Sequence, residues 1–132
     1  MSTLALEAAR KTITLLKNAN DVLPLEAAAV KTIAVIGPNA DRVMLGGYSG
    51  APLHSSTVLQ AIRERAPAGV EVLHHHGCRI TVGGSWAQDE VTPSDPEEDR
   101  KSIREAAALA VRADVVLLAI GDNEQTSREA WA

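Results

Sequence analysis

Three short apolar segments, rich in β-branched residues, constrain the fold of this chain more than any other feature. They span Thr32–Ile36, Val70–Leu73 and Asp114–Ile120. The first and the last are nearly continuous apolar runs, which is typical of strands buried on both faces of a parallel sheet. Gly37 and Gly121 follow these two runs directly, and a glycine at that place indicates the end of a strand. We therefore predict three strands of one mostly parallel sheet.

Helical sequence patterns lie between the predicted strands. Ser55 or Ser56 can cap a helix that runs to about Arg65, where a proline and a glycine then interrupt it. A further helix over roughly Pro96–Arg112 begins with three acidic residues, which suit the positive end of a helix dipole. Strands and helices that alternate with right-handed crossovers pair in parallel. The expected fold is an α/β sandwich of three layers, helix, sheet and helix, with a flavodoxin-like start and a strand order of about 2-1-3.

An amphipathic helix is predicted over Leu4–Leu16, because its apolar residues recur at helical spacing. The Leu-Pro-Leu segment around Pro24 cannot continue that helix. We interpret residues 1–25 as an N-terminal helix and linker, and residues 26–132 as the first part of a domain. That domain is expected to be incomplete at its C-terminus, since a helix would normally follow the last strand. A sheet interrupted in this way would leave a bare strand edge and would self-associate.

Composition excludes several classes of function. The chain has 132 residues, enough for one domain with a real core. Its net charge of −4, with scattered Lys and Arg, provides no clustered basic face for nucleic acid. No stretch approaches the ~20 apolar residues of a membrane span, and a single cysteine, Cys78, excludes an internal disulfide. The N-terminus lacks the pattern of a secretory signal, and the compartment of the protein is left open.

The few aromatic residues follow the predicted strands. In a chain without phenylalanine, Tyr48, Trp86 and Trp131 each lie in a loop after a strand. Open α/β sheets bind ligands beyond the carboxyl ends of their strands. These loops are therefore candidates for a binding site at one edge of the sheet.

The last loop carries the most chemically active side chains. Asp122, Glu124 and Glu129 follow a buried strand, and partial burial raises the pKa of a carboxyl group, as a general acid near neutral pH requires. Arg128 can hold a second carboxylate or a ligand oxygen. As a pattern alone, the segment is also typical of a solvated loop without chemistry.

Two other patterns suggest ligands with less support. His74–His76 and Cys78 suggest zinc, but consecutive strand residues point to alternate faces, and a second Cys or His cluster is missing. We favour structural or surface histidines and expect no metal. The loop that begins at Gly37 matches neither the dinucleotide-binding nor the P-loop pattern, and we expect no cofactor.

Several segments, taken in order, resemble one enzyme family. Ala8–Leu25 contains Leu-Leu-Lys-Asn followed by Leu-Pro-Leu, and Lys31–Asp41 contains Ala-Val-Ile-Gly-Pro-Asn-Ala-Asp. Gly46–Ser49, Gly77–Cys78 and Ala113–Glu124 extend the match over essentially the whole chain. The combination is similar to the C-terminal α/β-sandwich domain of glycoside hydrolase family 3. No segment resembles the N-terminal barrel of that family.

The resemblance implies a role in a retaining, exo-acting β-glycosidase, such as a β-glucosidase or a β-xylosidase. In the family, the nucleophile is an Asp on an N-terminal (β/α)8 barrel, and the acid/base is usually a Glu from a loop of the sandwich. By position, the resemblance gives that role to Glu129, with Glu124 as the second choice, and Tyr48, Arg128 and Trp131 would line the sugar site. The implied partners are a β-linked glucoside or xyloside and the absent barrel, without which the isolated chain should be inactive.

Two alternatives come from other functional classes. The first is a small flavodoxin-like module that binds a nucleotide or phosphate ligand, which Pro38 disfavours because it removes a backbone amide. The second is a non-catalytic interaction domain that docks a barrel-type partner through the Leu4–Leu16 helix. Nucleotide binding by calorimetry, or copurification of a barrel protein, would distinguish them from the glycosidase hypothesis.

Overall fold

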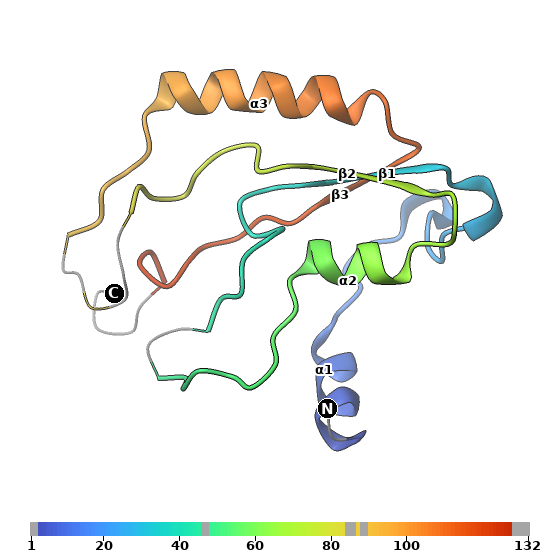
Figure 1. Ribbon diagram of the computed structural model, residues 1–132, viewed down its shortest axis with the longest axis horizontal. Coiled ribbons are helices and arrows are strands. Elements are labelled where there is room, and N and C mark those ends of the chain that lie inside the picture. Colours follow the sequence, from blue (N-terminus) through green and yellow to red (C-terminus); the bar gives the residue numbers. More distant parts are fainter. Residues whose placement is uncertain (1–2, 46–47, 84–86, 88–89, 128–132) are drawn as a thin grey trace.

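The computed structural model describes residues 3–45, 48–83, 87 and 90–127 of the chain (Figure 1). Helices and strands alternate within these residues. Their bounds are α1 Thr3–Thr12, β1 Thr32–Ile36, α2 Val58–Arg65, β2 Glu71–His75, α3 Pro96–Ala110 and β3 Val115–Leu118. Two short 3-10 turns, Ala19–Asp21 and Ala27–Ala29, lead from α1 to β1. No helix in this part of the chain is long and apolar enough to cross a membrane.

The strands form one parallel sheet in the order β2-β1-β3, which confirms the predicted topology. The central strand is β1, where Ile33 pairs with Val72 on one side and with Val115 on the other. Helix α2 connects β1 to β2, and helix α3 connects β2 to β3. All three strands therefore end at the same edge of the sheet.

The side chains of β1 alternate between two small cores. Ala34 and Ile36 pack with Ala106 of α3, whereas Val35 packs with Leu59 of α2. Figure 1 shows α3 and α2 on opposite sides of the sheet. Because β1 buries both of its faces, its sequence is a continuous apolar run. The predicted three-layer α/β architecture is confirmed.

Side-chain caps fix where α2 and α3 begin. The predicted serine cap is wrong, because Thr57 caps α2: its Oγ1 accepts the Gln60 amide at 3.1 Å, and the Gln60 side chain accepts the Thr57 amide at 3.1 Å. Helix α3 begins at Pro96 as predicted, and the Asp95 carboxylate accepts the Glu97 amide at 2.7 Å. These caps orient both crossover helices at the edge where the strands end.

Helix α1 is shorter than predicted, since it ends at Thr12 rather than at Leu16. The β-branched run Thr12, Ile13 and Thr14 has low helix propensity. None of the described residues of α1 is buried, so packing adds little to helix stability. Leu16 is 92% exposed, and the apolar face predicted for this helix has no cover among the described residues.

The ends of two strands also differ from the prediction. Asp114 precedes β3, and its carboxylate accepts the amides of Lys31 at 2.8 Å and Thr32 at 2.9 Å. These two hydrogen bonds hold the pKa of Asp114 below its ordinary value. Strand β2 continues past the predicted end to His75, because backbone pairing with β1 extends beyond the apolar side chains.

In the described part of the chain, β3 pairs with β1 alone. Its outer face exposes Val116, Leu118 and Ile120, which are 42%, 61% and 75% exposed. Together with Ile103 of α3, they line an apolar groove beside the sheet. Exposed apolar side chains next to an unpaired strand favour association with another polypeptide surface.

Candidate functional site

The carboxyl ends of β1 and β3 meet, and the loops that follow them lie in contact. The Ala119 amide donates to the Ile36 carbonyl at 2.7 Å, and the Asn39 amide donates to the Ala119 carbonyl at 3.2 Å. Gly37, with a φ of 129°, permits this approach, since a Cβ at this position would lie 2.2 Å from the Ala119 oxygen. The glycine at the end of β1 is therefore required for the packing of the two loops.

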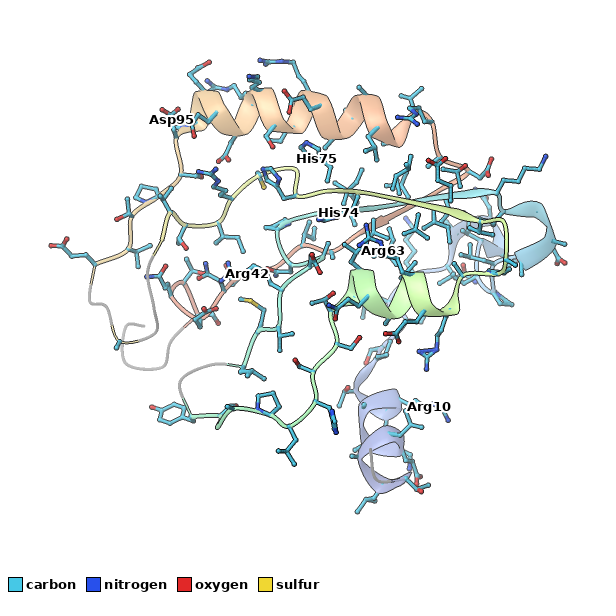
Figure 2. The ribbon with its side chains drawn as sticks, in the orientation of Figure 1. Arg10, Arg42, Arg63, His74, His75 and Asp95 are labelled. Carbon is cyan, nitrogen blue, oxygen red and sulfur yellow. The ribbon has the colours of Figure 1, made fainter. Side chains whose placement is uncertain are left out.

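Side chains of the loop after β1 hold the loop after β3 in two places. The Asn39 Nδ2 donates to the Asp122 carbonyl at 3.2 Å, and the Arg42 Nη2 lies 3.5 Å from the Glu124 Oε1. Figure 2 shows Arg42 beside the loop that follows β3. The Arg42 side chain is 50% exposed, so this ion pair contributes little to folding stability and chiefly orients the two side chains.

Asn123 organises the loop after β3 and joins it to the loop after β2. The residue is 4% exposed, and its Oδ1 accepts the amides of Gln125 at 2.9 Å and Thr126 at 3.1 Å. Its Nδ2 donates to the Thr81 Oγ1 at 2.8 Å. The loops that follow all three strands therefore converge on residues 122–126.

Two acceptor oxygens at this edge have unused hydrogen-bonding capacity. The Glu124 Oε2 and the Asn39 Oδ1 are buried and accept no hydrogen bond from the described residues. A buried acceptor without a donor destabilises a fold by about 1–3 kcal/mol. Such groups commonly coincide with functional sites, and here they belong to the same two loops.

The loop after β1 offers few groups to a phosphate. The amides of Gly37, Asn39 and Ala40 all donate to main-chain carbonyls, and Pro38 has no amide. A phosphate cradle needs several amides that point to the ligand. The backbone here therefore counts against the nucleotide-binding alternative.

The structure describes two of the five predicted site residues. Glu124 lies at the contact between two loops, with its side chain 24% exposed, next to Arg42. Tyr48 lies in the loop after β1 and is 84% exposed. The other predicted contacts, Glu129, Arg128 and Trp131, lie outside the described residues, as does the aromatic residue Trp86.

The histidine segment makes separate contacts. The His74 Nδ1 lies 2.8 Å from the Val35 carbonyl, the His75 Nδ1 accepts the Gly77 amide at 3.0 Å, and the His76 Nε2 lies 3.0 Å from the Ser102 Oγ. Figure 2 shows His75 at the end of β2 below α3, where its Nε2 lies 3.6 Å from a Glu105 oxygen. Across the described ranges, no cluster of three or more His, Cys, Asp or Glu could hold a metal ion.

Two groups near this segment have perturbed pKa values. Burial, and then the neighbouring His75 ring, lower the pKa of His76. Burial raises the pKa of the Cys78 thiol, and Asp99 raises it further. A thiol with a raised pKa is a poor nucleophile near neutral pH. These residues therefore have structural contacts without an arrangement for catalysis.

Sequence patterns do not single out Asn39, Arg42, Thr81 or Asn123 as site residues. Each contact joins residues far apart in the chain, with 42 positions between Thr81 and Asn123. The one available signal is local: Asn39 and Asn123 each follow a buried strand within a few residues. Polar residues at those places point to the ligand-binding edge of a sheet.

Comparisons with known proteins agree on one family. The family model of the Glycosyl hydrolase family 3 C-terminal domain matches residues 13–132. The chain is 32% identical to a β-xylosidase of Formosa agariphila over 133 residues, which covers 95% of this chain and 16% of that protein. It is 36% identical to a periplasmic β-glucosidase of Salmonella typhimurium over 135 residues, which covers 96% of this chain and 17% of that protein.

A solved structure gives the same result for the fold. A β-glucosidase from Erythrobacter marinus superposes with a TM-score of 0.83 at 42% sequence identity, covering 97% of this chain and 18% of that chain. The chain thus spans less than a fifth of the relatives that it matches. It belongs to glycoside hydrolase family 3, where it corresponds to the C-terminal domain.

Proposed function

We propose that this domain contributes the general acid/base and sugar-contacting loops to a retaining, exo-acting β-glycosidase. The nucleophile would be an Asp of a (β/α)8 barrel domain, and the substrate a β-linked glucoside or xyloside. In this proposal, residues 1–25 connect the barrel to the sandwich that begins at residue 26. The observation that carries the proposal is the convergence of three loops on residues 122–126, at the ligand-binding edge of a family 3 domain.

Glu129 is the first candidate for the acid/base, and Glu124 is the second. The Glu124 Oε1 lies 3.5 Å from the Arg42 guanidinium. To protonate a leaving group, this oxygen would first have to leave that contact, whereas the proposal requires no such step of Glu129. Tyr48, Arg128 and Trp131 contact the sugar, because an aromatic face suits the apolar side of a pyranose and a guanidinium suits its oxygens.

The isolated 132-residue chain is expected to be inactive. Retaining hydrolysis requires two carboxyl groups about 5–5.5 Å apart on either side of the scissile bond. In the proposal this chain supplies one of them, and the barrel supplies the other. The names of the relatives, β-xylosidase and β-glucosidase, support this substrate class.

The experiment compares Glu129→Gln and Glu124→Gln in the protein that joins this domain to its barrel, with Glu64→Gln in the exposed part of α2 as the matched control. For the acid/base variant we expect turnover of alkyl or phenyl glycosides to fall about 10²–10⁴-fold. Dinitrophenyl glycosides need no protonation to leave, so their glycosylation step should change little. Azide should then accelerate their turnover and yield a glycosyl azide, because it attacks the glycosyl-enzyme without a general base.

The outcome assigns the residue. If Glu129→Gln behaves in this way and Glu124→Gln does not, Glu129 is the acid/base. The reverse result would transfer the role to Glu124. If both variants match Glu64→Gln on every substrate, neither carboxylate is the acid/base and the proposed function of this loop is wrong.

A further inference from the structure

We propose that Asn123 and Thr81 form a positioning pair for glycoside hydrolysis, in which one buried hydrogen bond fixes the loop that carries the general acid/base. This inference rests on the proposed function above and adds two residues to it. Neither residue would touch the substrate. Their role would be to hold the loop after β3 at a fixed place relative to the loop after β2.

The Asn123 side chain is built into its surroundings. Its amide group uses both ends: the oxygen accepts two amides of its own loop, and the nitrogen donates to the Thr81 Oγ1 at 2.8 Å. The Asn123 carbonyl also accepts the amides of Thr126 at 3.2 Å and Ser127 at 3.1 Å. At 4% exposure, these bonds are shielded from water, and buried polar networks of this kind select one geometry.

Thr81 is itself held in place. It forms an antiparallel bridge with Pro93, and the adjacent Val82 amide donates to the Thr92 carbonyl at 2.9 Å. The hydroxyl that receives Asn123 thus projects from a segment bound to the chain that leads into α3. The hydrogen bond therefore connects two anchored segments, and the position of one depends on the other.

The connection bears on catalysis because of where the carboxylates lie. Glu124 directly follows Asn123, and Glu129 follows Ser127 by two residues. A general acid must lie within about 2.6–3.2 Å of the atom that it protonates. A displacement of 1 Å can lower a rate by about 10²-fold, so the segment that precedes the acid must itself be fixed.

The test uses Thr81→Val, which keeps the shape of the side chain but removes the acceptor, and Thr81→Ser, which keeps the hydroxyl, as the matched control. Both are made in the protein that joins this domain to its barrel. For Thr81→Val we expect kcat/KM for phenyl or alkyl glycosides to fall about 10–100-fold, with a change below about threefold for dinitrophenyl glycosides. Thr81→Ser should stay near wild type on both substrates.

A merely structural role would lower both substrates equally, since a misfolded fraction reduces all activity. That result, or an unchanged rate for Thr81→Val on both substrates, would overturn the proposal. Should Thr81→Val fold poorly, Asn123→Asp provides the second variant, because it keeps the acceptor oxygen and removes the donor to Thr81. The same selective loss on poor leaving groups is expected.

Glu129→Gln and Glu124→Gln, assayed alongside, separate this proposal from the one on which it rests. If neither carboxylate variant discriminates between leaving groups, the proposed function fails, and the positioning role fails with it. If one carboxylate variant discriminates and both Thr81→Val and Asn123→Asp do not, only the positioning role is wrong.

Discussion

Replacing Gly37 by alanine should destabilise the domain more than any other single methyl group added to a glycine of the described chain. The new Cβ would lie 2.2 Å from the Ala119 carbonyl oxygen, a backbone atom that cannot turn aside. Strand β3 would have to move away, which weakens the hydrogen bonds from Ala119 to Ile36 and from Asn39 to Ala119. Each is worth about 0.5–1.5 kcal/mol.

The backbone conformation adds a second cost. Gly37 has a φ of 129°, and a residue with a Cβ at positive φ is strained by about 1–3 kcal/mol. Together with the weakened hydrogen bonds, we expect the free energy of unfolding to fall by about 2–5 kcal/mol. A typical domain has only 5–15 kcal/mol in total, so the variant should unfold at clearly lower urea concentration.

Two glycines serve as matched controls in the same urea titration, followed by circular dichroism at a fixed protein concentration. Gly69 has a φ of 88° and open space around its Cβ position, so Gly69→Ala isolates the strain. Gly50 has open space and no positive φ, so Gly50→Ala should be close to neutral. The reasoning is refuted if Gly37→Ala loses no more stability than Gly69→Ala, because the contact with Ala119 would then have no cost.

Two further predictions follow from the sheet. The pKa of Asp114 is lowered by the two backbone amides at the start of β1, so its stabilising effect is present above the ordinary Asp pKa of about 3.9 and is lost as pH falls through the lower folded-state value. In Asp114→Asn, urea unfolding should show a smaller loss of stability in that acid range; an unchanged pH profile would contradict this. The isolated chain should self-associate through the exposed edge of β3, and Leu118→Lys should shift sedimentation toward the monomer, whereas wild type that is monomeric at every concentration would contradict the idea.

The sequence predicts the framework because the framework rests on local pattern. The bounds of β1 agree with the prediction, since a strand buried on both faces has no polar residue to interrupt it. β2 was predicted too short because His74 and His75 end the apolar run, yet their backbones pair with Val35 and Ile36. Backbone pairing does not depend on side-chain polarity, and no periodicity could have shown it.

The Asn123–Thr81 and Arg42–Glu124 contacts could not be predicted in the same way. They depend on which loops the sheet order brings together, and that order places the ends of β1 and β3 in contact through Gly37. The predicted Glu124 was located correctly as a residue of the loop after β3. Its ion-pair partner was not foreseen, because Arg42 precedes it by most of the domain.

The positions of the proposed catalytic groups should depend on polar contacts more than on apolar packing. The fully buried core is small, with Val35 and Leu59 as its largest side chains, and it lies within the sheet rather than under the loops. The loop after β3 is instead fixed by directional bonds to Asn39, Arg42 and Thr81. Because directional bonds specify position while apolar area mainly supplies stability, a change to these three residues should impair catalysis at nearly constant stability, whereas Leu59 should show the opposite separation.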